Sequence, residues 1–198
     1  MNGTLDAFLQ LDKQITLWIN NLNPQWMDPF WHTLSLVKIW FPLYAAVMVF
    51  ALWKLGWKKG LVVVLSLILC VILTDQLSGL VKAWAERPRP CRDSWMLLNG
   101  LRLPDGPAGG LWGFFSAHAS NCFGFATASY LGLRLNDRPH RYKAYEWCIG
   151  IWAALLSFSR IVLGAHFLGD VLAGAIFGAA VGSGMAYLAY AVILKARL

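Results

Sequence analysis

A histidine and an aspartate four residues apart form the pair in this sequence most able to do chemistry. His166 and Asp170 stand at positions i and i+4, so they are expected to share one face of a helix near its start. The carboxylate can accept a hydrogen bond from one imidazole nitrogen, which leaves the other nitrogen free to act as a nucleophile. The same two side chains could instead form a buried structural pair or supply two metal ligands. No cysteine cluster or HExxH motif completes a metal site, so we expect neither a metal nor another cofactor.

Three cationic residues, Lys82, Arg89 and Arg160, would suit an anionic group near this pair. A phosphate carries about −1.5 to −2 charges, and the planar fork of arginine matches its oxygens. Ser116 can cap a helix that begins beside it, and the free N–H groups of the first helical turn bind anions. His118 stands in that same turn. Alternatively, each arginine could extend toward lipid headgroups, and His118 could be structural.

The composition places these residues in a membrane protein. Of the 198 residues, 58% are hydrophobic and 14% are charged, whereas a soluble domain has about 45–50% and about 25%. So much apolar surface excludes a cytosolic globular protein, a disordered chain, a coiled coil and a disulfide-framed secreted domain. The net charge of +7 is spread between apolar runs, so we expect a membrane and an anionic substrate as partners, and no nucleic acid.

Six main helices are predicted, and together they form an all-α, polytopic transmembrane bundle that makes one domain over residues 1–198. Residues 4–22 read as an amphipathic helix, interrupted by Asp12 and Lys13, that lies in the membrane interface. A polar loop over residues 82–113 is rich in proline and glycine. Five apolar segments are expected to span the bilayer, namely residues 30–53, 61–80, 114–135, 145–162 and 168–194.

Basic connections orient this predicted bundle. Residues 54–60, residues 134–144 (with Arg138 and Arg141) and the C-terminal tail are basic. With five spans they all fall on one side, which the positive-inside rule makes cytoplasmic. The segments that carry the chemistry then share the opposite face. The loop 82–113 is also basic, which fits this orientation only if some of its charges have a functional use.

Several other residues have narrower predicted roles. Gly174, Gly178 and Gly182 are spaced by four, which allows a neighbouring helix to approach closely. Asp75 could orient Lys82, two turns further on, or pair with another polar group in the bundle. Glu86 and Arg87 are expected to form a solvated local pair. Small hydrophobic core roles are expected for the cysteines, which are Cys70, Cys91, Cys122 and Cys148.

Three segments of the chain resemble the signature of the type 2 phosphatidic acid phosphatase superfamily, which reads KxxxxxxRP, PSGH and SRxxxxxHxxxD. Residues 82–90 fit the first spacing, and residues 159–170 fit the third motif at every fixed position. The second motif departs, because Phe115 and Ala117 replace its proline and glycine. A glycine would let its backbone approach a phosphate in a conformation that alanine resists.

The resemblance implies a metal-independent lipid phosphatase that works through a phosphohistidine. His166 would be the nucleophile and Asp170 would orient it. His118 would protonate the leaving group and then activate water. The phosphate-binding side chains implied by the resemblance are Lys82, Arg89, Ser116 and Arg160.

The resembling bacterial proteins act on undecaprenyl diphosphate, phosphatidylglycerophosphate, phosphatidic acid or lipid A. We therefore expect a lipid phosphate substrate and a place in the bacterial inner membrane, with the active site at the periplasmic or outer side and the C-terminus in the cytoplasm. Residues 92–113 could contact lipid or form a lid. One alternative is a phosphotransferase of the same fold that passes the phosphate to a lipid acceptor. A second is a non-catalytic membrane binding or transport protein, although both histidines and the aspartate are retained. The sequence carries no signal for the oligomeric state.

Overall fold

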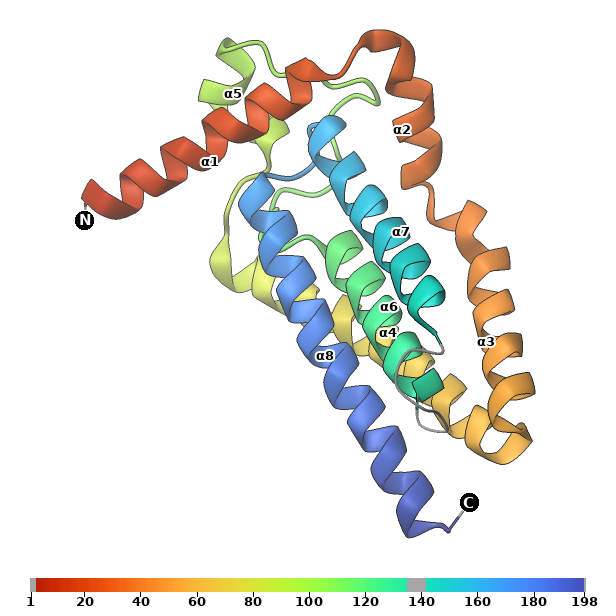
Figure 1. Cartoon of the computed structure of the whole chain (residues 1–198). Helices are drawn as coiled ribbons and strands as arrows, with labels where there is room; N and C mark the ends of the chain where they lie inside the picture. The colour runs from red at the N-terminus through yellow and green to blue at the C-terminus, as the bar shows by residue number, and fades with distance from the viewer. Residues whose placement is uncertain (1–2, 135–141, 198) are drawn as a thin grey trace.

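The computed structural model describes residues 3–134 and 142–197, and this part of the chain folds into eight α-helices without a strand. The long helices α4 (Trp57–Ala85), α6 (Ala117–Leu133), α7 (Lys143–Val162) and α8 (Leu168–Lys195) form the bundle. Helix α3 (Phe41–Leu55) packs along α4. Figure 1 shows α1 (Gly3–Leu22) lying crosswise over one end of this bundle, beside the short helix α5 (Ser94–Leu98). The predicted all-α helical bundle is confirmed.

Within residues 3–134 and 142–197, three helical stretches are long and apolar enough to cross a membrane, namely Val37–Leu55, Trp57–Ala85 and Leu168–Lys195. Large apolar side chains on them point outward; Val49 is 63% exposed and Ile176 is 73% exposed. Such surface is stable only against lipid. The protein is therefore an integral membrane protein. Because α6 and α7 fall outside these three stretches, the number of five spans stays a prediction.

The first predicted span, residues 30–53, is wrong as a single helix. The chain is extended at Leu36, which separates α2 (Asp28–Ser35) from a single 3₁₀ turn at Val37–Trp40 and from α3. Pro42 in the first turn of α3 explains why the α-helix starts there after the 3₁₀ turn, because proline favours a helix start and cannot continue a helix from the preceding turn. Two polar residues of the predicted span, His32 and Lys38, therefore lie outside α3.

The predicted second span is too short and the third begins too early. Helix α4 runs to Ala85 and stops where Glu86 adopts a left-handed conformation (φ 45°). Lys82 therefore stands in the last turn of α4 rather than in a loop. Helix α6 begins at Ala117, because the Ser116 hydroxyl accepts a hydrogen bond from the Ala119 N–H at 3.4 Å and so caps the helix.

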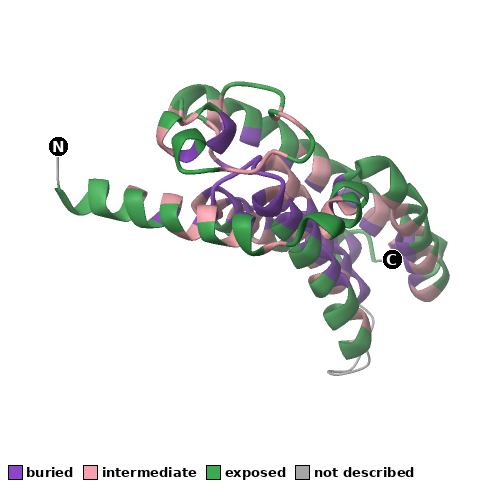
Figure 2. Ribbon diagram, turned by 90° about the horizontal axis from the view of Figure 1, so that it is seen from above, coloured by how far each residue is buried: buried purple, intermediate pink, exposed green. Residues whose placement is uncertain are grey.

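The predicted amphipathic helix at the N-terminus is confirmed as α1, with its polar face turned toward the protein. Asp12, Thr16 and Asn20 are buried, whereas Phe8 and Trp18 are more than 60% exposed. Seen from above in Figure 2, most of α1 is exposed. A helix that buries its polar stripe against protein and exposes its apolar side suits a membrane interface, where we continue to place α1.

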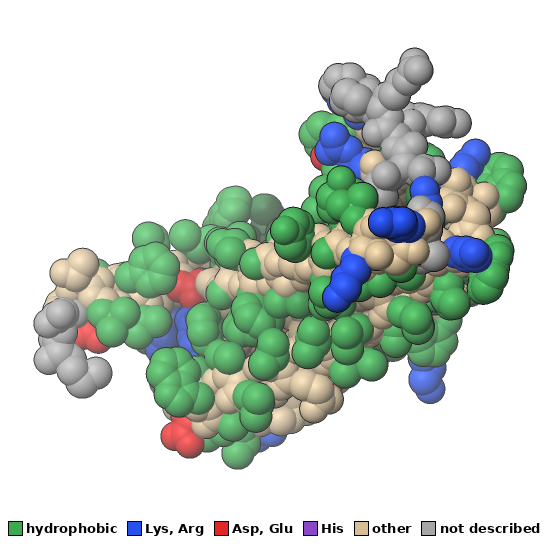
Figure 3. Space-filling model, turned by 90° about the horizontal axis from the view of Figure 1, so that it is seen from below, with side chains coloured by type: hydrophobic (Ala, Val, Ile, Leu, Met, Phe, Trp, Pro, Cys, Tyr) green, Lys and Arg blue, Asp and Glu red, His purple; other side chains and the backbone are tan. Residues whose placement is uncertain are grey.

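The ends of the helices opposite α1 carry the basic residues, including Lys54 of α3, Lys143 of α7 and Lys195 of α8. Figure 3 looks at this end and shows lysine and arginine side chains among hydrophobic ones. The expected gathering of basic connections at one end is thus found. Arg138 and Arg141 lie outside the described residues.

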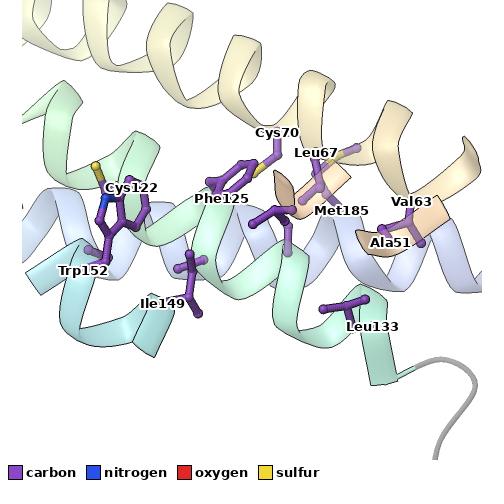
Figure 4. Packing of buried hydrophobic residues seen from close by; sticks show 14 of the residues in the cluster. Ala51, Val63, Leu67, Cys70, Cys122, Phe125, Leu133, Ile149, Trp152 and Met185 are labelled. Carbon is purple, nitrogen blue, oxygen red and sulfur yellow. The ribbon is translucent and has the colours of Figure 1, made fainter. Parts of the chain in front are cut away.

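The core lies where α3, α4, α6, α7 and α8 meet, around Leu67, Cys70 and Phe125 (Figure 4). Cys70, Cys91 and Cys122 are buried, as expected of small hydrophobic residues. The same prediction is wrong for Cys148, which lies on the outward face of α7 and is exposed.

The predicted glycine stripe allows α8 to pack against the backbone of α6. A Cβ atom at Gly178 would lie 2.1 Å from the Ser120 carbonyl oxygen, and one at Gly174 would lie 2.5 Å from that of Ser116. Because Ser116 begins α6 and Asp170 begins α8, this contact also sets the distance between two parts of the predicted site.

Gly178→Ala is expected to destabilise the protein by about 1–3 kcal/mol, since the added methyl forces α6 and α8 apart. The measurement is the midpoint of thermal unfolding in detergent, compared with Gly184→Ala. Gly184 lies on the same helix, and an added Cβ there meets nothing within 4 Å. Equal midpoints for the two variants would contradict the packing described above.

Candidate active site

The predicted site residues come together at the end of the bundle that α1 covers. The Ser116 N–H donates to the Asp170 carbonyl oxygen at 3.0 Å, which ties the start of α6 to the start of α8. The Arg89 side chain donates from Nη1 to the Ala165 carbonyl oxygen at 3.1 Å, which ties the loop after α4 to the turn before α8. Three segments distant in the sequence therefore meet at one place.

His166 lies in the turn between α7 and α8, and not on α8 as its spacing from Asp170 predicted. The N–H groups of Ala165 and His166 both donate to the Arg160 carbonyl oxygen, at 2.9 and 3.2 Å. Gly164 turns the chain with φ +66°, and a Cβ there would lie 2.9 Å from the Arg102 carbonyl oxygen. This tight turn, rather than a helical face, holds the imidazole in place.

The two nitrogens of His166 face opposite charges. Nδ1 lies 3.5 Å from Oδ2 of Asp170, within ion-pair range but without a hydrogen bond among the described residues, and Nε2 lies 3.3 Å from Nη1 of Arg89. Burial lowers the pKa of His166 to about 4; nearby Arg89 and Arg160 act in the same direction and Asp170 opposes them. The imidazole is therefore neutral at neutral pH, with a lone pair on the nitrogen that faces the cations.

Asp170 is fully buried in the first turn of α8. Its Oδ2 accepts a hydrogen bond from the Phe167 N–H at 3.1 Å, which caps the helix. Its Oδ1 accepts from Nη1 of Arg87 at 2.6 Å. The carboxylate is thus held from both sides with one oxygen toward His166.

The cationic side chains around His166 have donors to spare. The Nε atoms of Arg89 and Arg160 are buried and have no hydrogen-bond partner within the described ranges 3–134 and 142–197. Burial lowers the pKa of Arg89, which Cys91 and Asp170 partly oppose. Orphaned guanidinium donors beside a neutral imidazole fit the oxygens of a phosphate.

The remaining predicted residues lie close to His166, Arg89 or Asp170. His118, in the first turn of α6, is close enough to interact electrostatically with Arg160, His166 and Lys82, and hydrogen-bonds the Ser35 backbone. Lys82 interacts in the same way with Arg89, Asp75 and Asp170. Ser116 is fully buried as the cap of α6. All seven predicted residues are therefore neighbours. They are Lys82, Arg89, Ser116, His118, Arg160, His166 and Asp170.

Arg87 is a member of the site that the sequence reasoning missed, and the prediction of a solvated Glu86–Arg87 pair is wrong. Glu86 is exposed, but its left-handed turn directs Arg87 inward. There Arg87 donates to Asp170 and to Asp12 of α1, each at 2.6 Å, and its guanidinium lies 4.3 Å from the centre of the Phe167 ring. The repeat Arg-Pro-Arg-Pro is the sequence signal that both arginines have fixed positions.

The loop over residues 92–113 is attached to α1 and to α2, and Asn20 also ties α1 to the end of α7. Asn20 donates to the carbonyl oxygens of Val162 and Arg102, at 2.7 and 3.0 Å, and Arg102 pairs with Asp28. Lys13 pairs with Asp93 at 2.7 Å. Since Arg87, Arg89 and Arg102 all have defined partners, the basic character of this face no longer opposes the predicted orientation.

A cavity of about 640 Å³ opens beside His118, between α3, α4 and α6. Its wall is mostly apolar, with Phe41 and Ile72 among its residues. Asp75 and Asn121 form a polar patch in it, where Asn121 donates to Asp75 at 3.4 Å. Asp75 therefore has both predicted neighbours, a polar partner in the bundle and the charge of Lys82.

The sequence matches a known protein family over most of its length. The family model of the PAP2 superfamily matches residues 60–194. Two relatives are each 30% identical and are named lipid A 4'-phosphatase. The one from Bacteroides thetaiotaomicron aligns over 88% of this chain and 75% of its own length, and the one from Porphyromonas gingivalis over 98% and 77%. The fold and these relatives define the protein as a membrane lipid phosphatase. The chain belongs to the PAP2 superfamily.

Two solved structures share the fold. The PAP2-type phosphatidylglycerolphosphate phosphatase from Bacillus subtilis has a TM-score of 0.68 at 20% identity, over 96% of this chain and 87% of its own. LpxE from Aquifex aeolicus has a TM-score of 0.63 at 26% identity, over 87% of this chain and 92% of its own. The resemblance seen in the three sequence segments is thus confirmed at the level of family and fold.

Proposed function

We propose that this protein hydrolyses a phosphate monoester of lipid A, through a phosphohistidine formed on His166. The observation that carries the mechanism is the placement of a neutral imidazole with Nδ1 toward Asp170 and Nε2 toward Arg89. The substrate follows from the two lipid A 4'-phosphatases that align over most of this chain. They favour lipid A among the four lipid phosphates that the sequence left open.

In the first step, Nε2 of His166 attacks phosphorus and the bond from phosphorus to the lipid oxygen breaks. His118, charged only when the anionic phosphate offsets the cations around it, gives its proton to the departing oxygen. In the second step, water attacks the phosphohistidine, its proton passes to His118, and inorganic phosphate leaves while His166 regains its lone pair. Lys82, Arg89 and Arg160 would neutralise the transferring group, whose charge is spread over its equatorial oxygens.

The cavity beside His118 supports an amphiphilic substrate. An apolar wall between α3 and α4 can hold an acyl chain while the phosphate reaches the cations. The basic ends of the helices lie opposite this site, which supports a cytoplasmic C-terminus and an active site at the outer face of the inner membrane.

The substrate proposal is tested by offering purified protein lipid A, undecaprenyl diphosphate, phosphatidylglycerophosphate and phosphatidic acid in one detergent. Lipid A is expected to release phosphate fastest, and EDTA is expected to leave the rate unchanged. In water enriched in ¹⁸O the released phosphate should carry the label. A phosphotransferase would instead pass the phosphate, without label, to a lipid acceptor. Release from another lipid alone would contradict the substrate assignment.

The pH dependence follows from the burial of His166. The nucleophile must be unprotonated, and a group whose pKa is lowered to about 4 stays unprotonated well below the ordinary histidine value of 6.5. We expect the acid limb of kcat/KM to lie near pH 4, measured as lipid phosphate hydrolysis across the range of about pH 3 to 8. An acid limb centred near pH 6.5 would contradict a buried, neutral nucleophile.

A further inference from the structure

A half-buried arginine connects the first helix of the chain to the carboxylate beside His166. Arg87 donates from Nη1 to Oδ1 of Asp170 and from Nη2 to Oδ2 of Asp12, each at 2.6 Å. The side chains of Asp12 and Asp170 are 6% and 0% exposed. Asp12 and Asp170 stand 158 positions apart in the sequence, so only the fold brings them together.

The start of α8 holds both carboxylates. Oδ2 of Asp170 accepts from the Phe167 N–H at 3.1 Å, and Oδ1 of Asp12 accepts from the Gly169 N–H at 2.8 Å. The first N–H groups of a helix favour negative charge. The planar fork of Arg87 then bridges the two acids and fixes the rotation of the Asp170 carboxylate, which a lysine ammonium would not do.

We propose that Arg87 and Asp12 are positioning residues that keep Oδ2 of Asp170 directed at Nδ1 of His166. The proposal rests on the proposed function, in which His166 is the nucleophile. Because Oδ1 is taken by Arg87 and Oδ2 by Phe167, the carboxylate has one orientation. Without Arg87, a fully buried carboxylate would lose its compensating cation and would rotate or bind a proton. Helix α1 thereby takes part in the reaction without touching substrate.

The charges of this network also set the proton affinity of the His166–Asp170 pair. Removing the positive charge of Arg87 makes the pair bind a proton more tightly, and removing the negative charge of Asp12 does the reverse. The other charged or titratable groups that face the pair are Lys82 of α4, Arg89 of the following loop, His118 of α6 and Arg160 of α7. These remain the same in the variants below.

The test compares Arg87→Gln, Asp12→Asn and their double variant, with Arg92→Gln as the control. Arg92 lies in the same loop and is exposed. We expect both single variants to lower kcat about 10- to 100-fold, the range typical of groups that orient a reactive histidine, with KM nearly unchanged. The double variant should be no slower than Arg87→Gln alone, because both side chains act through Asp170. Arg92→Gln should match the parent.

Opposite shifts in pH distinguish positioning from loss of structure. The acid limb of kcat/KM should move up in pH for Arg87→Gln and down for Asp12→Asn. Arg87→Lys keeps the charge without the fork, so it should be slow with a nearly unshifted acid limb. Partial unfolding would move the limbs of both single variants in the same direction.

A measurement without substrate separates this proposal from the proposed function. Nuclear magnetic resonance of ¹⁵N-labelled histidine follows protonation of the His166–Asp170 pair in detergent. Opposite shifts there support the network even if no lipid releases phosphate, in which case the proposed function alone fails. If the parent is active while Arg87→Gln and Asp12→Asn keep its kcat and its histidine titration, the network has no positioning role. Multiplicative losses in the double variant would overturn it as well.

Discussion

His166→Ala is expected to lower kcat on the order of 10⁴- to 10⁶-fold, because loss of the nucleophile removes the covalent route altogether. Nothing else in the described pocket can replace it. His118 lies in the first turn of α6, and the cysteines nearest in the fold are buried in the core. The measurement is phosphate release from lipid A at saturating concentration.

Binding should survive in this variant, since Arg89 and Arg160 still offer their donors. Lipid A should therefore displace a bound fluorescent lipid phosphate from the His166→Ala variant at about the same concentration as from the parent protein. His32→Ala is the matched control, because it removes an exposed histidine that pairs with Asp105 at 2.7 Å and is not one of the predicted site residues. A residual rate within tenfold of the parent would remove His166 from the role of nucleophile.

His118→Ala is expected to lower kcat on the lipid substrate by about 10²- to 10⁴-fold, the size of a general acid–base contribution. With an aryl phosphate the first step should recover, because a good leaving group needs no proton. The second step still lacks a base for water, so phosphate should accumulate on the protein. Labelling with ³²P and acid treatment would detect it, since a phosphohistidine is labile in acid.

The control for this trap is the double variant His118→Ala with His166→Ala, which should take up no label. Label that persists in the double variant would place the covalent phosphate on another residue. Failure of His118→Ala to accumulate label, together with full loss of aryl phosphate turnover, would assign His118 to structure instead of proton transfer.

Much of the fold was readable from the sequence because hydrophobic periodicity reports which residues avoid water. The bundle and the amphipathic N-terminal helix were predicted in this way, and the glycine stripe of α8 was predicted from its spacing by four residues. The break at Leu36 was missed because apolar residues on both sides of it hide a change of backbone from any pattern of hydropathy. The end of α4 was missed because the helix continues past its apolar run.

The sequence by itself determined the family and the candidate site residues, namely two histidines, one aspartate and a set of cations at spacings typical of one family. Only the tertiary structure decided how those groups are held. In the tertiary structure His166 lies in a turn instead of on the predicted helix, and Arg87 pairs with both Asp12 and Asp170. The physical reason is that spacing along the chain reports local neighbours, whereas Arg87 is 75 positions from Asp12 and 83 from Asp170. A buried charge is compensated by whichever partner the fold brings to it.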